Sequence, residues 1–303
     1  MSQAKALQGQ TSPGTGKRYP TDLILKVMDI PRSTFYERVS VKPKLGKAPM
    51  KRGPKTALSD DEVVDSIRDI LENSPFSGEG HRKVRARLAI ENIHVGKNRV
   101  LRLMKANGLI APVRNKRTGV KRKHEGVIGT ERPNEMWGGD ITEVITQEDG
   151  KVYIFDMIDH CTGEIVGTHV TTNGTRFSAV ACLHTALGNQ IGEIKKDTAR
   201  GITLRLDHGT QFTSRRYVNE AHHLGFELSY SFVGQPQCNG MIERWHRTLK
   251  EQVLWTQCWK SLEEVKAAVG DFVEKYNEEW LLGRLGYMSP KAYKQSLALK
   301  AVA

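Results

Sequence analysis

The chain has 303 residues and a formal net charge of +12 at pH 7. This length is typical of about two domains, each able to bury its own hydrophobic core. No apolar run reaches the ~20 residues that a membrane-spanning helix needs, and residues 1–18 lack the apolar segment of a signal peptide. We therefore expect a soluble, cytoplasmic protein.

The positive charge is concentrated in the first part of the chain. Residues 1–130 hold 27 of the 46 Lys and Arg residues but only 12 of the 34 Asp and Glu residues. A basic module joined to a neutral or acidic one is typical of a protein that binds nucleic acid with the first module. The alternative is a solubilising basic surface, which is disfavoured because the basic residues fall inside helical patterns.

The first segments predict a small helical unit. Residues 1–18 are rich in Gly, Ser, Gln and Lys and are expected to be disordered. Residues 19–45 contain two short helical patterns separated at Pro31, with Ser33 as the expected cap of the second helix. This arrangement predicts a helix-turn-helix; a plain helical hairpin without DNA contact is the alternative. The expected recognition residues are Arg32, Ser33, Thr34 and Tyr36.

A second helical unit is predicted at residues 59–110, between basic linkers at residues 46–58 and 111–133. Its first helix opens with a capping box from Ser59 to Glu62. Three amphipathic helices follow the pattern of a second helix-turn-helix, whose cations would neutralise DNA phosphates. The basic residues on its polar faces are Arg82, Lys83, Arg85, Lys97, Arg99, Arg102 and Lys105.

From residue 134 the pattern changes to strands. Three strands joined by tight turns predict an antiparallel meander, and helices and strands alternate after it. The expected elements are strands at 136–146, 151–161 and 164–172, a helix at 176–189 with Phe177 inward, a strand at 202–207, a helix at 211–225, a strand at 226–232, and helices at about 239–256 and 261–280, the last with a capping box at Ser261. This order predicts an α/β (α+β) domain, a mixed five-stranded sheet flanked by helices.

Three carboxylates stand at informative places in that topology. Asp140 lies in the first strand, and Asp207 follows the fourth. Glu243 lies near the start of the helix predicted at about 239–256. If the fourth strand runs beside the first, the two aspartates become neighbours. Adjacent carboxylates repel each other unless a cation lies between them, and hard oxygen ligands favour Mg²⁺ or Mn²⁺ over zinc. The acids alone are not specific, because the chain has 34 of them.

The residues around these acids are more specific. Four motifs occur in order: Trp137 before Asp140-Ile141-Thr142, DHGTQFTS at 207–214, NGMIERWHRTLK at 239–250 and LGYMSPKAY at 285–293. Together with the 35 residues between Asp207 and Glu243, they resemble the integrase-type transposases, specifically the OrfB transposases of the insertion sequence three family. More distantly they are similar to retroviral integrases. Residues 81–109 resemble the family's second helix-turn-helix.

The resemblance implies a catalytic core with a ribonuclease-H-like fold at residues 134–295, followed by a tail at 296–303. Asp140, Asp207 and Glu243 would be the catalytic acids and would bind Mg²⁺ or Mn²⁺, with two ions per site. The implied reactions are nicking at transposon ends and attack of a 3′-hydroxyl on a phosphodiester. The implied partners are DNA, as terminal inverted repeats and target, and further copies of the chain, because a homo-oligomer would bridge two ends at the bacterial nucleoid.

Spacing adds candidate DNA contacts and two departures from the family pattern. Arg247 and Lys250 lie four and seven residues after Glu243, on the same helix face, and Arg244 adjoins them; a surface ion pair between Glu243 and Arg247 is the alternative. Gly139 stands where the family usually has a larger residue, and glycine in a strand often marks a close approach. His208 stands where Asn is common and could support Asp207.

Two other functions are compatible with this pattern. One is a DNA-binding regulator that has lost catalysis, although the complete set of acids disfavours it. The other is a structure-specific nuclease on the same fold, which would cut without joining. The two predicted DNA-reading units disfavour the nuclease.

Overall fold

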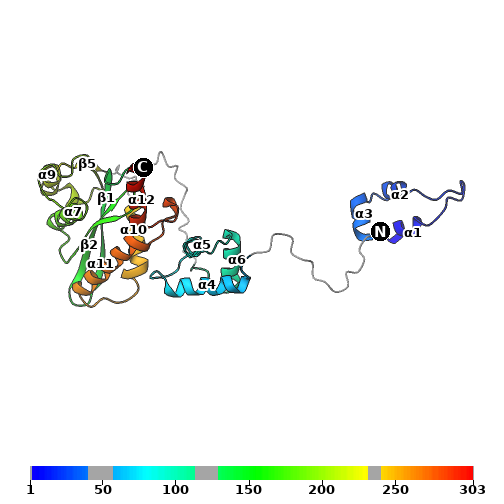
Figure 1. Ribbon diagram of the computed structural model, residues 1–303, viewed down its shortest axis with the longest axis horizontal. Helices are drawn as coiled ribbons and strands as arrows, with labels where there is room; N and C mark the ends of the chain where they lie inside the picture. Colours follow the sequence, from blue (N-terminus) through cyan, green and yellow to red (C-terminus); the bar gives the residue numbers. More distant parts are fainter. Residues whose placement is uncertain (1, 40–56, 113–128, 231–239, 303) are drawn as a thin grey trace. The chain divides into compact units, whose positions relative to one another are not determined.

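The computed structural model describes residues 2–39, 57–112, 129–230 and 240–302 (Figure 1). Most of the predicted linkers at 46–58 and 111–133 therefore lie outside the described residues. The chain divides into one unit at residues 1–57 and a second at residues 58–303. No helix of the described ranges is both long enough and apolar enough to cross a bilayer.

The N-terminal unit consists of helices α1 (Ser2–Leu7), α2 (Thr21–Val27) and α3 (Arg32–Val39). The prediction of two helices broken at Pro31 is confirmed. The prediction that residues 1–18 are disordered is wrong, because α1 buries Ala4 against Ile24, Leu25 and Phe35. Composition alone missed this helix, since its apolar face is only a few residues wide.

The expected cap of α3 is also wrong. The helix begins at Arg32, so Ser33 lies within its first turn. Arg32 reaches back to Asp22 of α2, with 3.3 Å between Nη1 and Oδ1, and its guanidinium lies 5.9 Å from the ring centroid of Tyr36. The first contact joins α3 to α2 at their exposed side, and the second lies within α3.

The second helical unit contains α4 (Asp60–Asn73), α5 (His81–Ile90) and α6 (Lys97–Ala106). The predicted capping box is confirmed: the Ser59 Oγ accepts from the Glu62 N–H at 3.2 Å, and the Glu62 Oε2 accepts from the Ser59 N–H at 2.7 Å. Each bond satisfies a backbone group that the helix start leaves open. The three helices pack on a core that includes the fully buried Ile67, Leu88 and Met104.

In the described residues one sheet is formed by five strands, β1 (Met136–Thr146), β2 (Gly150–Asp159), β3 (Ile165–Thr171), β4 (Thr203–Leu206) and β5 (Glu227–Tyr230). Their order is β3-β2-β1-β4-β5. The pairs β1/β2 and β2/β3 are antiparallel, and β1/β4 and β4/β5 are parallel. This confirms the predicted α/β class and the ribonuclease-H-like mixed sheet, with β1 at its centre.

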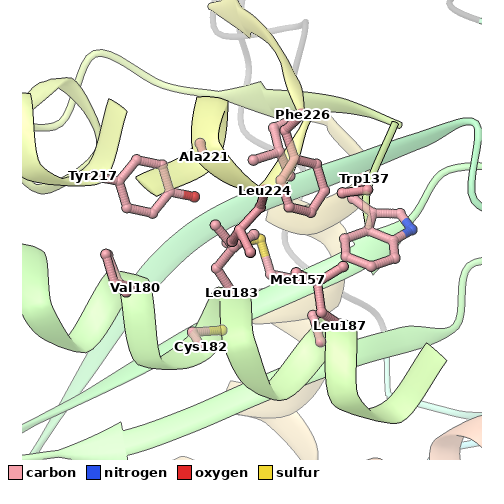
Figure 2. Packing of buried hydrophobic residues seen from close by; sticks show 14 of the residues in the cluster. Trp137, Met157, Val180, Cys182, Leu183, Leu187, Tyr217, Ala221, Leu224 and Phe226 are labelled. Atoms are coloured by element: carbon pink, nitrogen blue, oxygen red, sulfur yellow. The ribbon is translucent and has the colours of Figure 1, made fainter. Parts of the chain in front are cut away.

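One face of the sheet is covered by α7 (Arg176–Gln190) and α9 (Arg215–Leu224), with the short α8 (Thr210–Thr213) ahead of α9 (Figure 1). The side chains between them are apolar, as Figure 2 shows for Trp137, Leu183 and Leu224. Phe177 is not inward as predicted but 58% exposed, because it lies in the first turn of α7. The single helix predicted at 211–225 is two helices, since Ser214 caps α9 by accepting from the Tyr217 N–H.

The opposite face is covered by α10 (Gly240–Leu249), its π-helical continuation (Lys250–Leu254) and α11 (Leu262–Glu279). The capping box expected at Ser261 does not form; instead the Leu262 N–H donates to the Asp149 Oδ2 at 2.6 Å. The expected tail at 296–303 is wrong as far as Val302, because these residues continue helix α12 (Pro290–Val302).

Residues 58–303 pack as one unit through the loop between α4 and α5. Phe76 is 3% exposed and lies edge-on to Trp280 and Phe272, with ring centroids 4.8 and 6.1 Å away. The Lys83 Nζ lies 3.1 Å from the ring centroid of Trp280. Burial of an aromatic side chain in a neighbouring core fixes the relative position of two elements more firmly than polar contacts do. The second helical unit is therefore attached to the sheet through an apolar contact.

Candidate active site

The topology brings the two predicted aspartates together. Strand β4 runs parallel to β1, with Gly138 paired to Arg205. Asp140 lies two residues after Gly138 in β1, and Asp207 lies two residues after Arg205, just past the end of β4. Asp207 follows β4 directly, and its Oδ1 accepts from the Gly209 N–H at 2.9 Å. The predicted pairing of the first and fourth strands is confirmed, and Asp140 and Asp207 each follow the paired segment of their strands.

Glu243 arrives from the first turn of α10, as predicted. Desolvation and the negative charge of Asp140 raise the pKa of Glu243 above its ordinary value, and the nearby His246 opposes that rise. A like charge raises a carboxyl pKa only when it is close. The Glu243 and Asp140 carboxylates therefore share one electrostatic environment.

A row of polar residues crosses three strands beneath α10. Asp140 pairs with Asp156 across β1 and β2, and Asp156 pairs with Thr168 across β2 and β3. Directly paired residues project from the same face of a sheet. Asp156 is fully buried and accepts from the Thr168 Oγ1 at 2.7 Å and from the Trp245 Nε1 at 2.8 Å. A buried carboxylate needs such partners to offset its lost hydration.

His246 joins this row to Asp140. Its Nε2 lies 3.1 Å from the Asp156 Oδ2, its Nδ1 lies 3.4 Å from the Asp140 Oδ2, and the residue is 5% exposed. Burial alone would lower the pKa of His246, but its hydrogen bonds with the two aspartates and their negative charges outweigh burial and raise the pKa to about 9. The imidazole is therefore protonated at neutral pH.

The sequence interpretation missed both His246 and Asp156. Two signals were available: a carboxylate in the middle of the apolar strand Val152–Ile158, and a histidine three residues after Glu243 on the same helix face. Neither signal says that the two residues meet, because 90 positions separate them along the chain.

The donor chemistry of the three acids fits a hard divalent cation. Asp140, Asp207 and Glu243 offer carboxylate oxygens, which Mg²⁺ and Mn²⁺ prefer. Desolvation and, after it, the negative charge of Asp140 raise the pKa of Glu243, and a cation between the two carboxylates would relieve the second of these effects. Within the described residues, no group of three Asp, Glu, His or Cys side chains is close enough together to hold a metal ion.

The two departures from the family pattern have different structural settings. A side chain at Gly139 would place its Cβ 2.7 Å from the Leu206 Cδ2 and 2.8 Å from the Met157 Sδ, so the close approach expected there is confirmed. His208 is exposed and stacks on Tyr230, with ring centroids 5.5 Å apart. Its predicted role beside Asp207 stays a prediction.

The basic residues of α10 lie beside the acids. Arg244 and Arg247 are exposed, and the Arg247 Nε donates to the Glu251 Oε1 at 2.8 Å. Arg247 therefore forms an ion pair with Glu251 and not with Glu243. Lys250 opens the π-helical turn, where the helix departs from the regular periodicity that placed this residue on the Glu243 face. Their contact with DNA stays a prediction.

Several of the predicted DNA contacts in the second helical unit also support its fold. The Arg99 Nη2 and the Arg102 Nη2 each lie 2.8 Å from a carboxylate oxygen of Asp60. The Arg85 Nε donates to the Val95 carbonyl at 3.1 Å. Such residues can contact phosphate only with the part of the side chain that remains exposed.

Other predicted contacts differ in exposure. Arg82 and Lys97 are exposed at the starts of α5 and α6, whereas Lys83 lies over Trp280. In the N-terminal unit Ser33 and Tyr36 are exposed and Thr34 is half-buried. We keep all of these as predictions of DNA contact.

A mixed sheet in this order, with acids on β1, just after β4 and on α10, defines an integrase-type catalytic core. Family models agree. The chain matches an integrase core domain over residues 130–236 and a second integrase core domain model over residues 224–290, and it matches an HTH-like domain over residues 59–117.

Known relatives identify the family. The chain is 30% identical over 254 residues to the transposase for insertion sequence element IS629 of Shigella sonnei, covering 80% of this chain and 83% of that protein. It is 26% identical over 298 residues to a putative transposase, InsK for insertion sequence element IS150, of Escherichia coli, covering 94% and 96%. The chain belongs to the insertion-sequence transposases and is an integrase-type polynucleotidyl transferase.

Among solved structures, the catalytic core domain of BIV integrase is 22% identical to the chain. The match covers 55% of this chain and 99% of that one, with a TM-score of 0.40.

Proposed function

We propose that this transposase cuts the ends of its insertion sequence and joins the exposed 3′-hydroxyls to target DNA, with Asp140, Asp207 and Glu243 as its catalytic acids. The observation that supports the proposal is the parallel pairing of β4 with β1, which Asp140 and Asp207 follow at the same spacing, together with the effect of the Asp140 charge on Glu243 of α10. Two Mg²⁺ or Mn²⁺ ions held by these acids would activate the attacking oxygen and stabilise the leaving one.

The other residues supply DNA binding and geometry. Arg244, Arg247 and Lys250 follow Glu243 along one helix and would contact the phosphates of the DNA end. The helical units at 19–45 and 59–110 would bind the terminal inverted repeats, with their cations setting the register on the duplex. Because two ends must be joined in one event, a homo-oligomer that bridges them is part of the proposal, acting on DNA in the bacterial cytoplasm.

The test uses the purified full chain and labelled duplexes that carry the ends of the element. The wild-type chain should bind these ends without a divalent ion, cut them when Mg²⁺ is added, and transfer them to a target plasmid. Glu243→Gln should bind equally well but cut at least about a hundredfold more slowly, since it removes a charged ligand worth several kcal/mol in the transition state. Glu263→Gln, an exposed exchange on α11, is the matched control.

Two outcomes would redirect the proposal. Binding without cutting by the wild-type chain would make it a DNA-binding regulator. Cutting without strand transfer would make it a structure-specific nuclease. Normal activity in a folded Glu243→Gln variant would remove Glu243 from the catalytic set.

A further inference from the structure

His246 contacts both Asp140 and the fully buried Asp156. It therefore connects the buried polar residues under α10 to one of the proposed catalytic acids. We infer that His246 is a positioning residue, whose Nδ1 holds the carboxylate of Asp140 in the orientation that catalysis uses. The inference rests on the proposed function, because it assigns His246 a role through Asp140.

The two oxygens of Asp140 have separate partners. Its Oδ1 accepts from the Ile141 N–H at 2.8 Å, and its Oδ2 lies 3.4 Å from the His246 Nδ1. A carboxylate has about four lone-pair sites, so both oxygens keep capacity for a further ligand. The side chain of Asp140 is 24% exposed, which leaves that capacity accessible. Without His246, only the backbone of the next residue would restrain the carboxylate.

His246 can restrain Asp140 because it is itself held. Its other nitrogen contacts Asp156, whose second oxygen is bound by Thr168 of β3. Trp245 also bonds to Asp156 and stacks on Phe272, with ring centroids 5.7 Å apart and planes 16° from parallel. The chain of contacts thus starts in packed aromatic and strand residues and ends at Asp140. A contact fixed at both ends orients its target at little further entropic cost.

The same contact also sets the position of Glu243. Residues three apart are neighbours on the surface of an α-helix. His246 is buried between Asp140 and Asp156, whereas Glu243 is exposed but close enough to Asp140 to feel its charge. Anchoring His246 between two carboxylates of the sheet fixes the rotation of α10 about its own axis. The distance between Glu243 and Asp140 follows from that rotation.

A purely structural role would involve the other ring nitrogen. If His246 served only to satisfy the buried Asp156, its Nε2 would be the essential atom and its Nδ1 would be dispensable. Asparagine and glutamine separate the two roles, because the amide nitrogen of Asn reaches the position of the imidazole Nδ1 and that of Gln reaches the position of Nε2. A positioning role requires the nitrogen that Asn supplies, whereas a purely structural role requires the nitrogen that Gln supplies.

The experiment compares His246→Asn with His246→Gln in the full-length chain. Positioning predicts that Asn, which keeps the donor to Asp140, cuts pre-bound DNA ends about tenfold or more faster than Gln in single turnover. Stability should show the reverse order: Gln, which keeps the partner of Asp156, should unfold at the higher temperature, because an unpaired buried carboxylate is costly. Equal affinities for end DNA would confirm that the difference lies in the rate constant.

Crystal structures of the two variants give a readout that does not depend on activity. The Asp140 carboxylate should keep its orientation with Asn and rotate away with Gln. Should Asn alone fail to fold, the double variant His246→Asn with Asp156→Asn keeps the donor to Asp140 and removes the buried charge.

The outcomes separate this inference from the proposed function. A Gln variant that cuts as fast as the Asn variant, or an Asp140 carboxylate in the same orientation in both crystal structures, would overturn the role of His246 while wild-type cutting still upheld the proposed function. A wild-type chain that cuts no end DNA would remove the proposed function, and the Asp140 orientations would still decide whether His246 holds that side chain.

Discussion

The two faces of the catalytic sheet bury different kinds of residue. The face under α7 and α9 is a continuous apolar core that includes Leu183 and Leu224 (Figure 2). The face under α10 and α11 is also largely apolar, but it carries the row from Thr168 through Asp156 to Asp140. The candidate catalytic residues Asp140 and Glu243 adjoin this second face.

The difference shows how one sheet divides stability and chemistry. Apolar burial contributes stability without directional demands, so the α7 face can be packed for density alone. A buried charge must be paired and hydrogen-bonded, which makes every neighbour of Asp156 specific. We therefore expect substitutions on the α7 face to change stability at constant activity, and substitutions along the polar row to change activity.

The largest loss of stability is expected from Leu183→Ala on the apolar face. Leu183 is fully buried, and truncating such a side chain costs about 2–5 kcal/mol. Chemical denaturation should show this loss, while the single-turnover cutting rate of the folded fraction stays at the wild-type value. A slower rate in the folded protein would break the proposed division between the faces.

The next effect concerns a second histidine near the polar face. Burial, together with the positive charges of Arg284 and Arg205, lowers the pKa of His160 to about 4, the opposite of His246. The unfolded chain, with a pKa near its ordinary 6.5, binds the proton more readily. Stability from neutral His160 is therefore present above about pH 6.5 and lost as the pH falls toward 4.

This loss amounts to about 3 kcal/mol, since one pKa unit corresponds to about 1.4 kcal/mol. Denaturation of the wild-type chain and of His160→Gln between pH 7 and pH 4 measures it. The free energy of unfolding of His160→Gln should fall less steeply between pH 7 and pH 4 than that of the wild-type chain. Parallel curves for the two proteins would show that His160 does not titrate in this way.

A smaller cost is expected for Gly139→Ala, which adds a methyl group to the apolar face next to Asp140. The new Cβ would lie within 3 Å of the ends of Leu206 and Met157, which are flexible enough to shift. Overpacking of this kind costs about 1–3 kcal/mol. Met157→Ala should therefore lower the free energy of unfolding by less in the Gly139→Ala background than in the wild-type chain. A Gly139→Ala variant as stable as the wild type would show that the strand has space for the methyl group.

The smallest effect on stability is expected for Arg82→Ala, within about 0.5 kcal/mol, because the residue is exposed. Affinity for end DNA should fall, and the slope of log affinity against log salt should decrease by about one. Asp61→Asn, an exposed change on α4, is the control that leaves the slope unchanged or raises it. An unchanged slope for Arg82→Ala would remove this residue from the DNA surface.

Much of the fold follows from local pattern. The bounds predicted for the first strand match β1, and the Ser59–Glu62 box forms, because alternation and capping are local properties. The second box does not form at Ser261, because the Glu264 carboxylate that it requires accepts instead from the Lys260 N–H at 2.8 Å, and Asp149, over a hundred positions away, accepts from the Leu262 N–H. Local pattern also predicted which face of α7 is buried. It did not show that the first turn of this helix, with Phe177, extends beyond the core.

The site was predictable only in part for the same reason. Asp140, Asp207 and Glu243 stand in motifs; the parallel pairing of β4 with β1 brings together the strands that precede the two aspartates, and Glu243 is added by the packing of α10 on β1. His246 and Asp156 meet through tertiary packing, and nothing in either local sequence specifies the other. The predicted acids were visible from the sequence, whereas the residues that orient them required the structure.

The most direct test of the account is whether the acids act as one unit. Single-turnover cutting should be measured for Asp140→Asn, Glu243→Gln and the double variant, each bound to end DNA. Residues that act together are strongly non-additive, so the double variant should be about as slow as the slower single variant. Losses that multiply in the double variant would show that Asp140 and Glu243 act independently, and would contradict the shared site.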